Sequence, residues 1–120
     1  MKNPKLIKKA VEWAKKKGFK KLKANCEDFE KPVQYQNASK DEVFVPDVTG
    51  VQRVGKSYIE VALKEDNIRK IVTKWKLLST LANMKGGQFI LLAPRGHKSF
   101  AEKIVQKYQL SAQVIYLKNE

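Results

Sequence analysis

Hydrophobic and polar positions along the chain follow two periods, and the changes between them divide it into helices and strands. After Asn3, apolar residues recur every three or four positions as far as Gly18, which indicates an amphipathic helix over about 4–17 with a capped start and a glycine stop. The period then falls to two over 19–26, as expected for a strand with one buried face. The chain therefore opens with a helix followed by a half-buried strand.

The middle of the chain predicts a loop and then a hairpin. Proline, asparagine and mixed charges over about 28–41 indicate a loop with a short extended piece near its centre. Two apolar segments follow, over about 43–51 and 57–64. The short turn at 53–56 allows them to pair as antiparallel strands. Three strands thus precede the second helix.

The C-terminal half alternates helices with strands. Asp66 or Asn67 can cap the second helix, and Ser99 with Glu102 three residues later forms a capping box for the third. An uninterrupted apolar run between these helices is typical of a strand covered on both faces. The predicted elements are a helix from Ile68 to about Ala82, a strand over 89–93, a helix over about 100–108 and a strand over 114–117.

The order of these elements predicts the fold class. A strand, a helix and a second strand in the same sheet form a right-handed crossover with parallel pairing, whereas the hairpin adds antiparallel strands. The order α-β-β-β-α-β-α-β therefore predicts a single α/β domain over residues 1–120. Its mixed sheet is flanked by helices.

Length and composition restrict the class of protein. With 120 residues, of which 42% are hydrophobic, the chain can build one buried core. No apolar run approaches the roughly 18–20 residues that cross a bilayer, and the lysine-rich start lacks the apolar segment of a signal peptide. With Cys26 as the only cysteine and His97 as the only histidine, an internal disulfide and a thiolate or imidazole zinc site are excluded. We expect a soluble, cytoplasmic protein with no membrane partner.

The charge balance predicts a polyanionic partner. Lysine and arginine number 25 against 12 acidic residues, a net charge of +13, and most are lysines, which suit phosphate better than base edges. Ten of the lysines fall within residues 1–23. We therefore expect nucleic acid as the partner, with DNA favoured over RNA, although a lysine-rich solvated surface would give the same composition. The candidate contacts are Lys8, Lys9, Lys15 and Lys16 on the first helix, and Arg95 and Lys98 before the third.

Two acidic residues fall inside the apolar strands of the predicted hairpin, Asp47 in the first and Glu60 in the second. A buried carboxylate needs a cation, a hydrogen-bond donor or water beside it. Adjacent strands lie about 4.8 Å apart, so two carboxylates that face the same way can share one divalent ion, a common arrangement for phosphodiester chemistry. The alternative is an exposed acid that pairs with a lysine across the sheet.

The hairpin resembles the motif of the PD-(D/E)XK, or restriction-endonuclease-like, nuclease superfamily, with Val45-Pro46-Asp47 in one strand and Tyr58-Ile59-Glu60-Val61-Ala62 in the next. The predicted order of elements is that of the superfamily's core, so the resemblance covers nearly the whole chain. It implies a metal-dependent nuclease in which Asp47, Glu60 and the backbone carbonyl of Val61 bind Mg²⁺ or Mn²⁺. Nucleases of this kind often pair to cut two strands, which implies a homodimer.

The family carries a lysine two residues after the glutamate, and here that position is Ala62. In the family this lysine orients the attacking water and neutralises the phosphate. Lys64 leans from the same strand face, and Lys70 or Lys74, one turn apart on the following helix, could reach back to the site. Two alternatives stay open. One is a catalytically inactive nucleic-acid-binding or assembly protein on the same fold, and the other is a lysine-rich interaction module that binds no nucleic acid.

Overall fold

The computed structural model describes residues 2–37, 42–53 and 55–118, which form α-helices and β-strands. None of the described helices has the length and apolar character that a membrane span requires. The elements in chain order are α1 (Pro4–Lys16), β1 (Lys20–Ala24), β2 (Tyr35–Asn37), β3 (Glu42–Phe44), β4 (Val48–Gln52), β5 (Gly55–Val61), α2 (Ile68–Met84), β6 (Gly86–Ala93), α3 (Lys98–Lys107) and β7 (Gln113–Tyr116).

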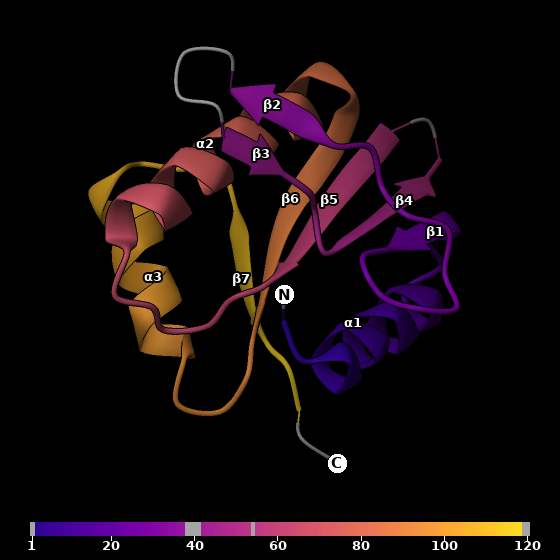
Figure 1. Ribbon diagram of the computed structural model, residues 1–120, viewed down its shortest axis with the longest axis horizontal. Coiled ribbons are helices and arrows are strands. Elements are labelled where there is room, and N and C mark those ends of the chain that lie inside the picture. The colour runs from indigo at the N-terminus through magenta and orange to yellow at the C-terminus, as the bar shows by residue number, and fades with distance from the viewer. Residues whose placement is uncertain (1, 38–41, 54, 119–120) are drawn as a thin grey trace.

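Within the described residues, five strands form one mixed sheet in the order β1-β4-β5-β6-β7. β1, β4 and β5 pair antiparallel, whereas β5, β6 and β7 run parallel because a helix carries the chain back before each of the last two strands. Figure 1 shows this sheet and the separate β2–β3 hairpin. The predicted α/β fold class, with a mixed sheet flanked by helices, is therefore confirmed.

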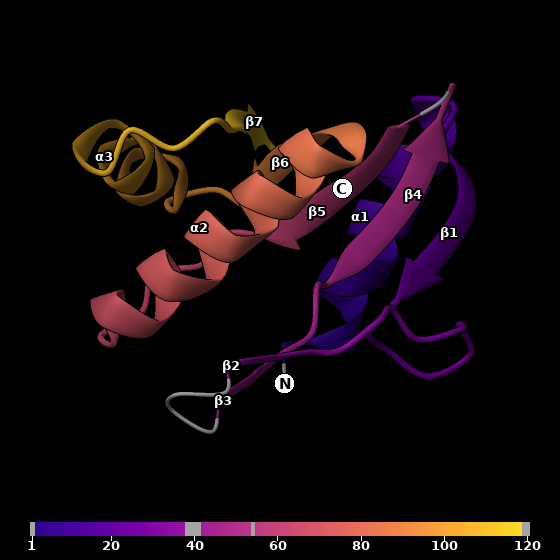
Figure 2. The same ribbon diagram turned by 90° about the horizontal axis from the view of Figure 1, so that it is seen from above.

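Helices cover both faces of the sheet (Figure 2). α1 packs on one face, where Ile7 of the helix shares a buried cluster with Ile59 and Val61 of β5. α2 and α3 cover the other face, over Tyr58 and Ala62. Because successive side chains of a strand point to opposite faces, β5 contributes to both cores, which explains its nearly continuous apolar sequence.

The strand predicted over 43–51 is wrong in its extent, because the chain divides it in two. β3 ends at Phe44 and pairs with β2, whereas β4 begins at Val48 and enters the main sheet. Pro46 lies between them, and a proline has no N–H to give to a strand ladder. Asp47 is therefore in the bend before β4 and not in the middle of a strand.

β2 lies in the predicted loop over 28–41 and overlaps the short extended piece expected near its centre, whereas β3 lies at the start of the strand predicted over 43–51. β2 forms near the end of that loop, and the hydroxyl of Tyr35 lies 3.0 Å from the hydroxyl of Tyr58 in β5. Residues 38–41 of the predicted loop lie outside the described residues, and so does Val54 in the predicted turn between β4 and β5. Five strands thus precede α2 in the described part of the chain, two more than the three predicted.

The first two helices are capped as predicted. The side-chain oxygen of Asn3 accepts a hydrogen bond from the backbone N–H of Lys5 at 2.9 Å, and Pro4 occupies the first helical position. Asn67 accepts in the same way from the backbone N–H of Lys70 at 3.2 Å. The cap residue Asn3 directly follows Lys2, so α1 begins two residues after Lys2.

The capping box predicted at Ser99 is wrong, because α3 begins at Lys98 and encloses Ser99 in its first turn. His97 precedes the helix but gives it no side-chain hydrogen bond. Its Nδ1 accepts instead from the backbone N–H of Lys64 at 2.9 Å, which joins the segment after β5 to the segment after β6. His97 therefore has a structural contact at a position for which the sequence allowed an exposed turn or a contact with nucleic acid.

Candidate metal centre

Asp47 and Glu60 meet where β4 begins and β5 ends. Asp47 is 3% exposed, and Glu60 has no exposed surface. The backbone N–H of Asp47 donates to Glu60 Oε1 at 2.7 Å, and the N–H of Val61 donates to Asp47 Oδ2 at 2.9 Å. The carboxylate of Glu60 thus accepts from the backbone of Asp47, and the carboxylate of Asp47 accepts from the backbone of the residue after Glu60. These two hydrogen bonds fix the orientation of both side chains.

The ammonium group of Lys2 lies at the point toward which these groups turn. Its Nζ is 2.5 Å from Asp47 Oδ2, 3.3 Å from Glu60 Oε2 and 2.7 Å from the carbonyl oxygen of Val61. These are the three groups that the family resemblance assigns to a metal ion. The sequence did not single out Lys2, because it is one of many lysines near the N-terminus and nothing local marks its partner 45 positions away.

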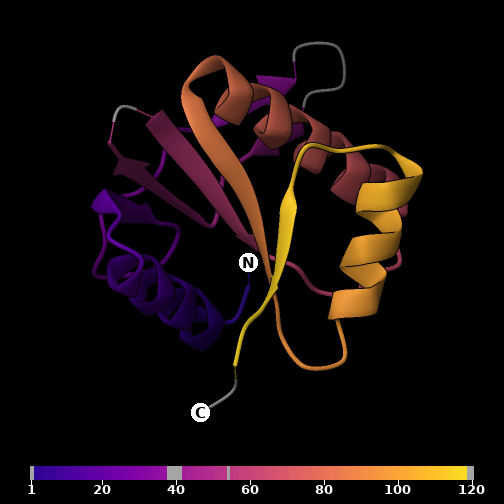
Figure 3. The same ribbon diagram turned by 180° about the vertical axis from the view of Figure 1, so that it is seen from behind.

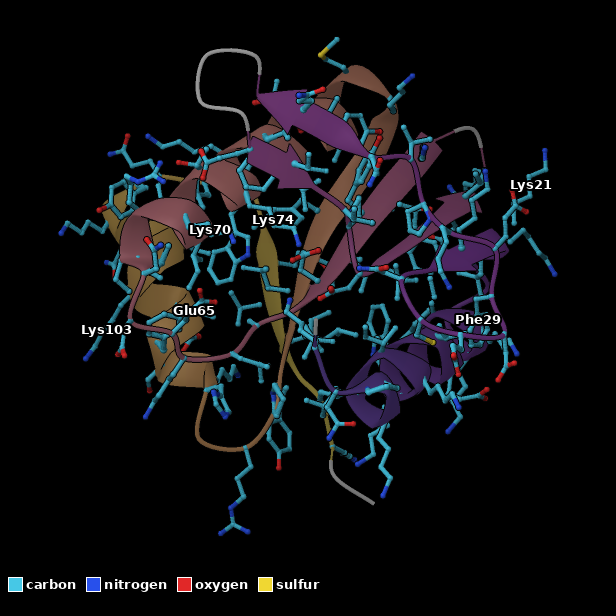
Figure 4. All side chains as sticks on the ribbon, viewed as in Figure 1. Lys21, Phe29, Glu65, Lys70, Lys74 and Lys103 are labelled. Carbon is cyan, nitrogen blue, oxygen red and sulfur yellow. The ribbon has the colours of Figure 1, made fainter. Side chains whose placement is uncertain are left out.

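Lys74 supplies a second ammonium group to the site from α2. Its Nζ lies 3.1 Å from Glu60 Oε2, and its side chain is 20% exposed. Figure 4 shows Lys70 and Lys74 as neighbours on the same part of α2. Lys64 and Lys70 line the same cleft, and within the described residues neither forms an ion pair with the two acids. Of the three lysines that the sequence offered, the structure brings Lys74 to the carboxylates.

The surroundings of Ala62 explain why the ammonium group beside Glu60 comes from α2 and not from this position. It is fully buried on the face of β5 that α2 and α3 cover, in the same cluster as Tyr58 and Trp75. A lysine at this position would have to place its stem in that packed cluster. α2 therefore occupies the space of such a side chain, and Lys74 of α2 brings an ammonium group to the same carboxylate.

The charges of the site shift the pKa values of its groups in different directions. Burial raises the pKa of Asp47, and the adjacent negative charge of Glu60 acts the same way; together they outweigh the lowering effect of Lys2 and Lys74. Burial also acts to raise the pKa of Glu60, but the charges of Lys2 and Lys74 and the N–H of Asp47 outweigh it and lower that pKa. Burial acts to lower the pKa of Lys2, but the two carboxylates outweigh it and raise it. Lys2 and Glu60 are therefore an ion pair at neutral pH.

The oxygen atoms of the site suit a hard divalent cation. Mg²⁺ and Mn²⁺ prefer oxygen ligands, and Asp47, Glu60 and the carbonyl of Val61 direct three of them at one point. No group of three or more histidine, cysteine or acidic side chains able to hold a metal occurs in the part of the chain that the structure describes, and the third oxygen at this point is the backbone carbonyl of Val61. Because Mg²⁺ binds oxygen at about 2.0–2.1 Å, the three oxygens would have to close in from their present distances to Lys2.

The site opens into a cleft of about 470 Å³ between α2, β5 and the segment that joins β3 to β4. Cationic side chains line this cleft beside the two acids. The lysines that line it are Lys2, Lys64, Lys70 and Lys74.

A second, strongly basic groove of about 630 Å³ lies between the exposed face of α1 and the end of β7. It contains Lys8, Lys9 and Lys16 of the predicted nucleic-acid contacts, together with the rings of Trp13 and Tyr116. Figure 3 shows β7 beside β6, with α1 and α3 on either side in this view. The groove therefore joins cationic and aromatic side chains on one surface.

The other predicted nucleic-acid contacts are placed differently. Arg95 follows β6 and lines a small adjoining pocket with Lys9 and Lys118. Lys15 is exposed and pairs with Glu12 at 3.6 Å, the surface pairing typical of residues three apart on a helix. Lys98 is exposed at the start of α3 and lines neither groove.

Comparisons of the chain with protein-family models, with curated proteins and with solved structures found no match. We therefore infer the function from the geometry of the chain itself. Two buried carboxylates and one backbone carbonyl surround the ammonium group of Lys2, and the ammonium group of Lys74 lies beside Glu60. A basic groove lies along α1.

Proposed function

We propose that this chain is a cytoplasmic nucleic-acid-binding protein with a restriction-endonuclease-like fold, which hydrolyses phosphodiester bonds with Mg²⁺ or Mn²⁺. The observation that carries the proposal is the convergence of Asp47 Oδ2, Glu60 Oε2 and the carbonyl oxygen of Val61 on one cation, 2.5–3.3 Å away. The sheet order supports the fold, because an antiparallel part that bears both acids continues across α2 into parallel strands.

The proposed reaction adds water across one ester bond of the nucleic-acid backbone. The water oxygen bonds to phosphorus, the bond from phosphorus to one ester oxygen breaks, and that oxygen takes up a proton. A divalent cation at this site would lower the pKa of a water and polarise the phosphate. Asp47 and Glu60 would hold the cation. Lys74, 3.1 Å from Glu60, would neutralise the phosphate beside it, the role that the family gives to the lysine replaced here by Ala62.

The basic groove supplies a path for the nucleic-acid backbone toward the site. Lys2 lies two residues before the start of α1, so the helix whose exposed face carries Lys8, Lys9 and Lys16 begins close to the carboxylates. Lysines bind phosphate as point charges and read no sequence, so affinity would depend on backbone charge and shape. Because a duplex has two backbones to cut, a homodimer on DNA would bring one site to each.

A catalytically inactive nucleic-acid-binding or assembly protein on the same fold is the second candidate. The contacts of Lys2 favour it, because its ammonium group satisfies Asp47, Glu60 and the carbonyl of Val61 without a metal ion. In that case the basic groove still binds nucleic acid, and the two acids serve to anchor the N-terminal segment.

Cleavage assays separate the two candidates. Supercoiled plasmid, linear duplex and single-stranded oligonucleotides are incubated with the protein and either Mg²⁺ or Mn²⁺. We expect metal-dependent cleavage, and we expect Asp47→Asn and Glu60→Gln each to lower its rate by at least about 100-fold, since each removes a charged ligand without changing the shape of the side chain.

Lys103→Met is the matched control, because it removes one exposed charge on α3, and no described residue of α3 lines the cleft that contains the two acids. Figure 4 shows Lys103 at the edge of the molecule. The rate of this variant should stay within about twofold of the parent chain. Cleavage that survives Asp47→Asn unchanged would contradict the proposal. Binding of all three substrates with no cleavage in either metal would favour the second candidate.

A further inference from the structure

Lys2 is bound as completely as a lysine side chain can be. An ammonium group has three N–H bonds, and each of them has an acceptor here: one oxygen of Asp47, one of Glu60 and the carbonyl of Val61. Lys2 forms salt bridges with both carboxylates, and Lys74 forms one with Glu60. The three oxygens therefore cannot hold Lys2 and a divalent cation at the same time.

We propose that Lys2 is a tethered cation that competes with the divalent metal for these three oxygens, so that the metal enters the site only by displacing it. This inference rests on the metal site of the proposed function. It goes beyond that function by assigning the control of metal loading to a residue of the chain itself. Lys2 thereby sets which cations the site accepts: a monovalent ion brings no more charge than the ammonium group it would replace, whereas a divalent ion does.

The position of Lys2 in the fold allows this exchange. It precedes the cap residue Asn3, so it belongs to no helix or strand, and the first hydrogen bonds of α1 do not depend on it. Its side chain is 25% exposed, in contrast to the buried acids, and it lines the open cleft. Withdrawal of this one side chain into the cleft would free three oxygens without disturbing the hydrogen bonds that hold Asp47 and Glu60.

Direct measurement of Mn²⁺ binding tests the inference without an activity assay. Free Mn²⁺ is followed by electron paramagnetic resonance as it is titrated with the protein, with Lys2→Met and with Lys103→Met. Lys2→Met should bind one Mn²⁺ at least about tenfold more tightly than the parent chain, because no internal cation has to leave. Lys103→Met removes the same charge elsewhere and should change the affinity by less than about twofold.

The gain must depend on the same oxygens. The double variant Lys2→Met/Asp47→Asn should lose the tight Mn²⁺ site. Equal affinity of Lys2→Met and the parent chain, no binding by either, or an equal gain in Lys103→Met would each overturn the inference. Tight binding by Lys2→Met without any cleavage of nucleic acid would support the inference while contradicting the proposed function. If the parent chain cleaves nucleic acid and Lys2→Met binds Mn²⁺ no more tightly than the parent chain, the proposed function would be supported and the inference about Lys2 would be overturned.

Thermal unfolding gives a second readout. Without metal, Lys2→Met should unfold at a lower temperature than the parent chain, because two buried acids lose a cation. Mn²⁺ should raise that temperature by about 3 °C or more, since it binds only the folded state. An unfolding temperature of Lys2→Met that does not respond to Mn²⁺ would overturn the inference. Lys2→Gln, which keeps two N–H donors, replaces Lys2→Met if that variant does not fold, and the same results are expected of it.

Discussion

Glu60 has no exposed surface, yet its carboxylate is ionised beside a second buried acid. One of its oxygens accepts from the backbone N–H of Asp47, and the other faces the ammonium groups of Lys2 and Lys74 at 3.3 and 3.1 Å. A buried charge is tolerated only when such partners replace the water that it has lost. The stability of this part of the protein should therefore depend on the lysines as well as on the acids.

Replacing Lys74 should destabilise the fold more than replacing its neighbour Lys70. Lys74→Met leaves part of the buried charge of Glu60 without a partner and should lower the free energy of unfolding by about 1–3 kcal/mol. Lys70→Met removes an equal charge one turn away, where no ion pair occurs among the described residues, and should cost less than about 0.5 kcal/mol. Urea unfolding followed by tryptophan fluorescence measures both.

The coupling between the two residues can be checked separately. In a double-mutant cycle, Lys74→Met combined with Glu60→Gln should destabilise less than the sum of the single changes, because the second change removes the charge that the first left unpaired. Strict additivity would show that the 3.1 Å contact contributes nothing to stability.

At the scale of elements, the backbones of β5 and β6 come very close to each other at the start of both strands. A Cβ atom on Gly87 would stand 1.9 Å from the carbonyl oxygen of Lys56, and one on Gly55 would stand 2.1 Å from the carbonyl oxygen of Gly86. Both distances are far inside van der Waals contact, so glycine is required for the two backbones to come this close. The same pair of strands carries Glu60 opposite Leu91 further along.

Gly87→Ala should therefore lower the free energy of unfolding by about 2 kcal/mol or more, because β6 must move away from β5 to accept the methyl group. Gln88→Ala, at the next position of the same strand, changes an exposed side chain and keeps the backbone N–H that donates to Ser57; it should cost less than about 0.5 kcal/mol. Chemical denaturation of the two variants compares them. Similar stabilities of the two variants would show that β5 and β6 accept the methyl group without moving apart.

At the scale of the whole molecule, α1 presents a lysine-rich part of a basic surface. The net charge is +13. The groove between α1 and β7 is lined by lysines of α1 and by Lys118, which follows β7. A polyanion bound in this groove would release counterions, so its affinity would fall steeply with salt. Exposed lysines of β1 carry similar charge on a different part of the surface and allow a matched comparison.

We expect Lys8→Gln/Lys16→Gln to weaken binding of a duplex oligonucleotide and to reduce the slope of log affinity against log salt by about 1–2, since each lost phosphate contact contributes roughly 0.9. Lys20→Gln/Lys21→Gln makes the same change in net charge on β1 and should leave the slope nearly unchanged. Figure 4 shows Lys21 projecting outward at the edge of the molecule. Fluorescence anisotropy over a salt series measures both variants, and an equal loss in both would show that the groove has no special part in binding.

The sequence by itself determined the elements whose pattern is local. The apolar stripes of α1 and α2, their caps at Asn3 and Asn67, and the buried run of β6 follow from side chains a few positions apart. It also marked Asp47 and Glu60, because a carboxylate among apolar strand residues is costly unless a partner meets it. The division of the strand over 43–51 at Pro46 was not foreseen, because its apolar pattern continues across the break.

Only the tertiary structure decided which cations meet the two acids. Lys2 and Asp47 are 45 positions apart, and their contact depends on how α1 packs against the sheet, which no local pattern records. Lys64, Lys70 and Lys74 were equivalent candidates in the sequence, and the placement of α2 over β5 brings Lys74 to Glu60. Periodicity reports the neighbours of a residue along the chain, whereas a site of buried charges is assembled by strand pairing and helix packing between distant segments.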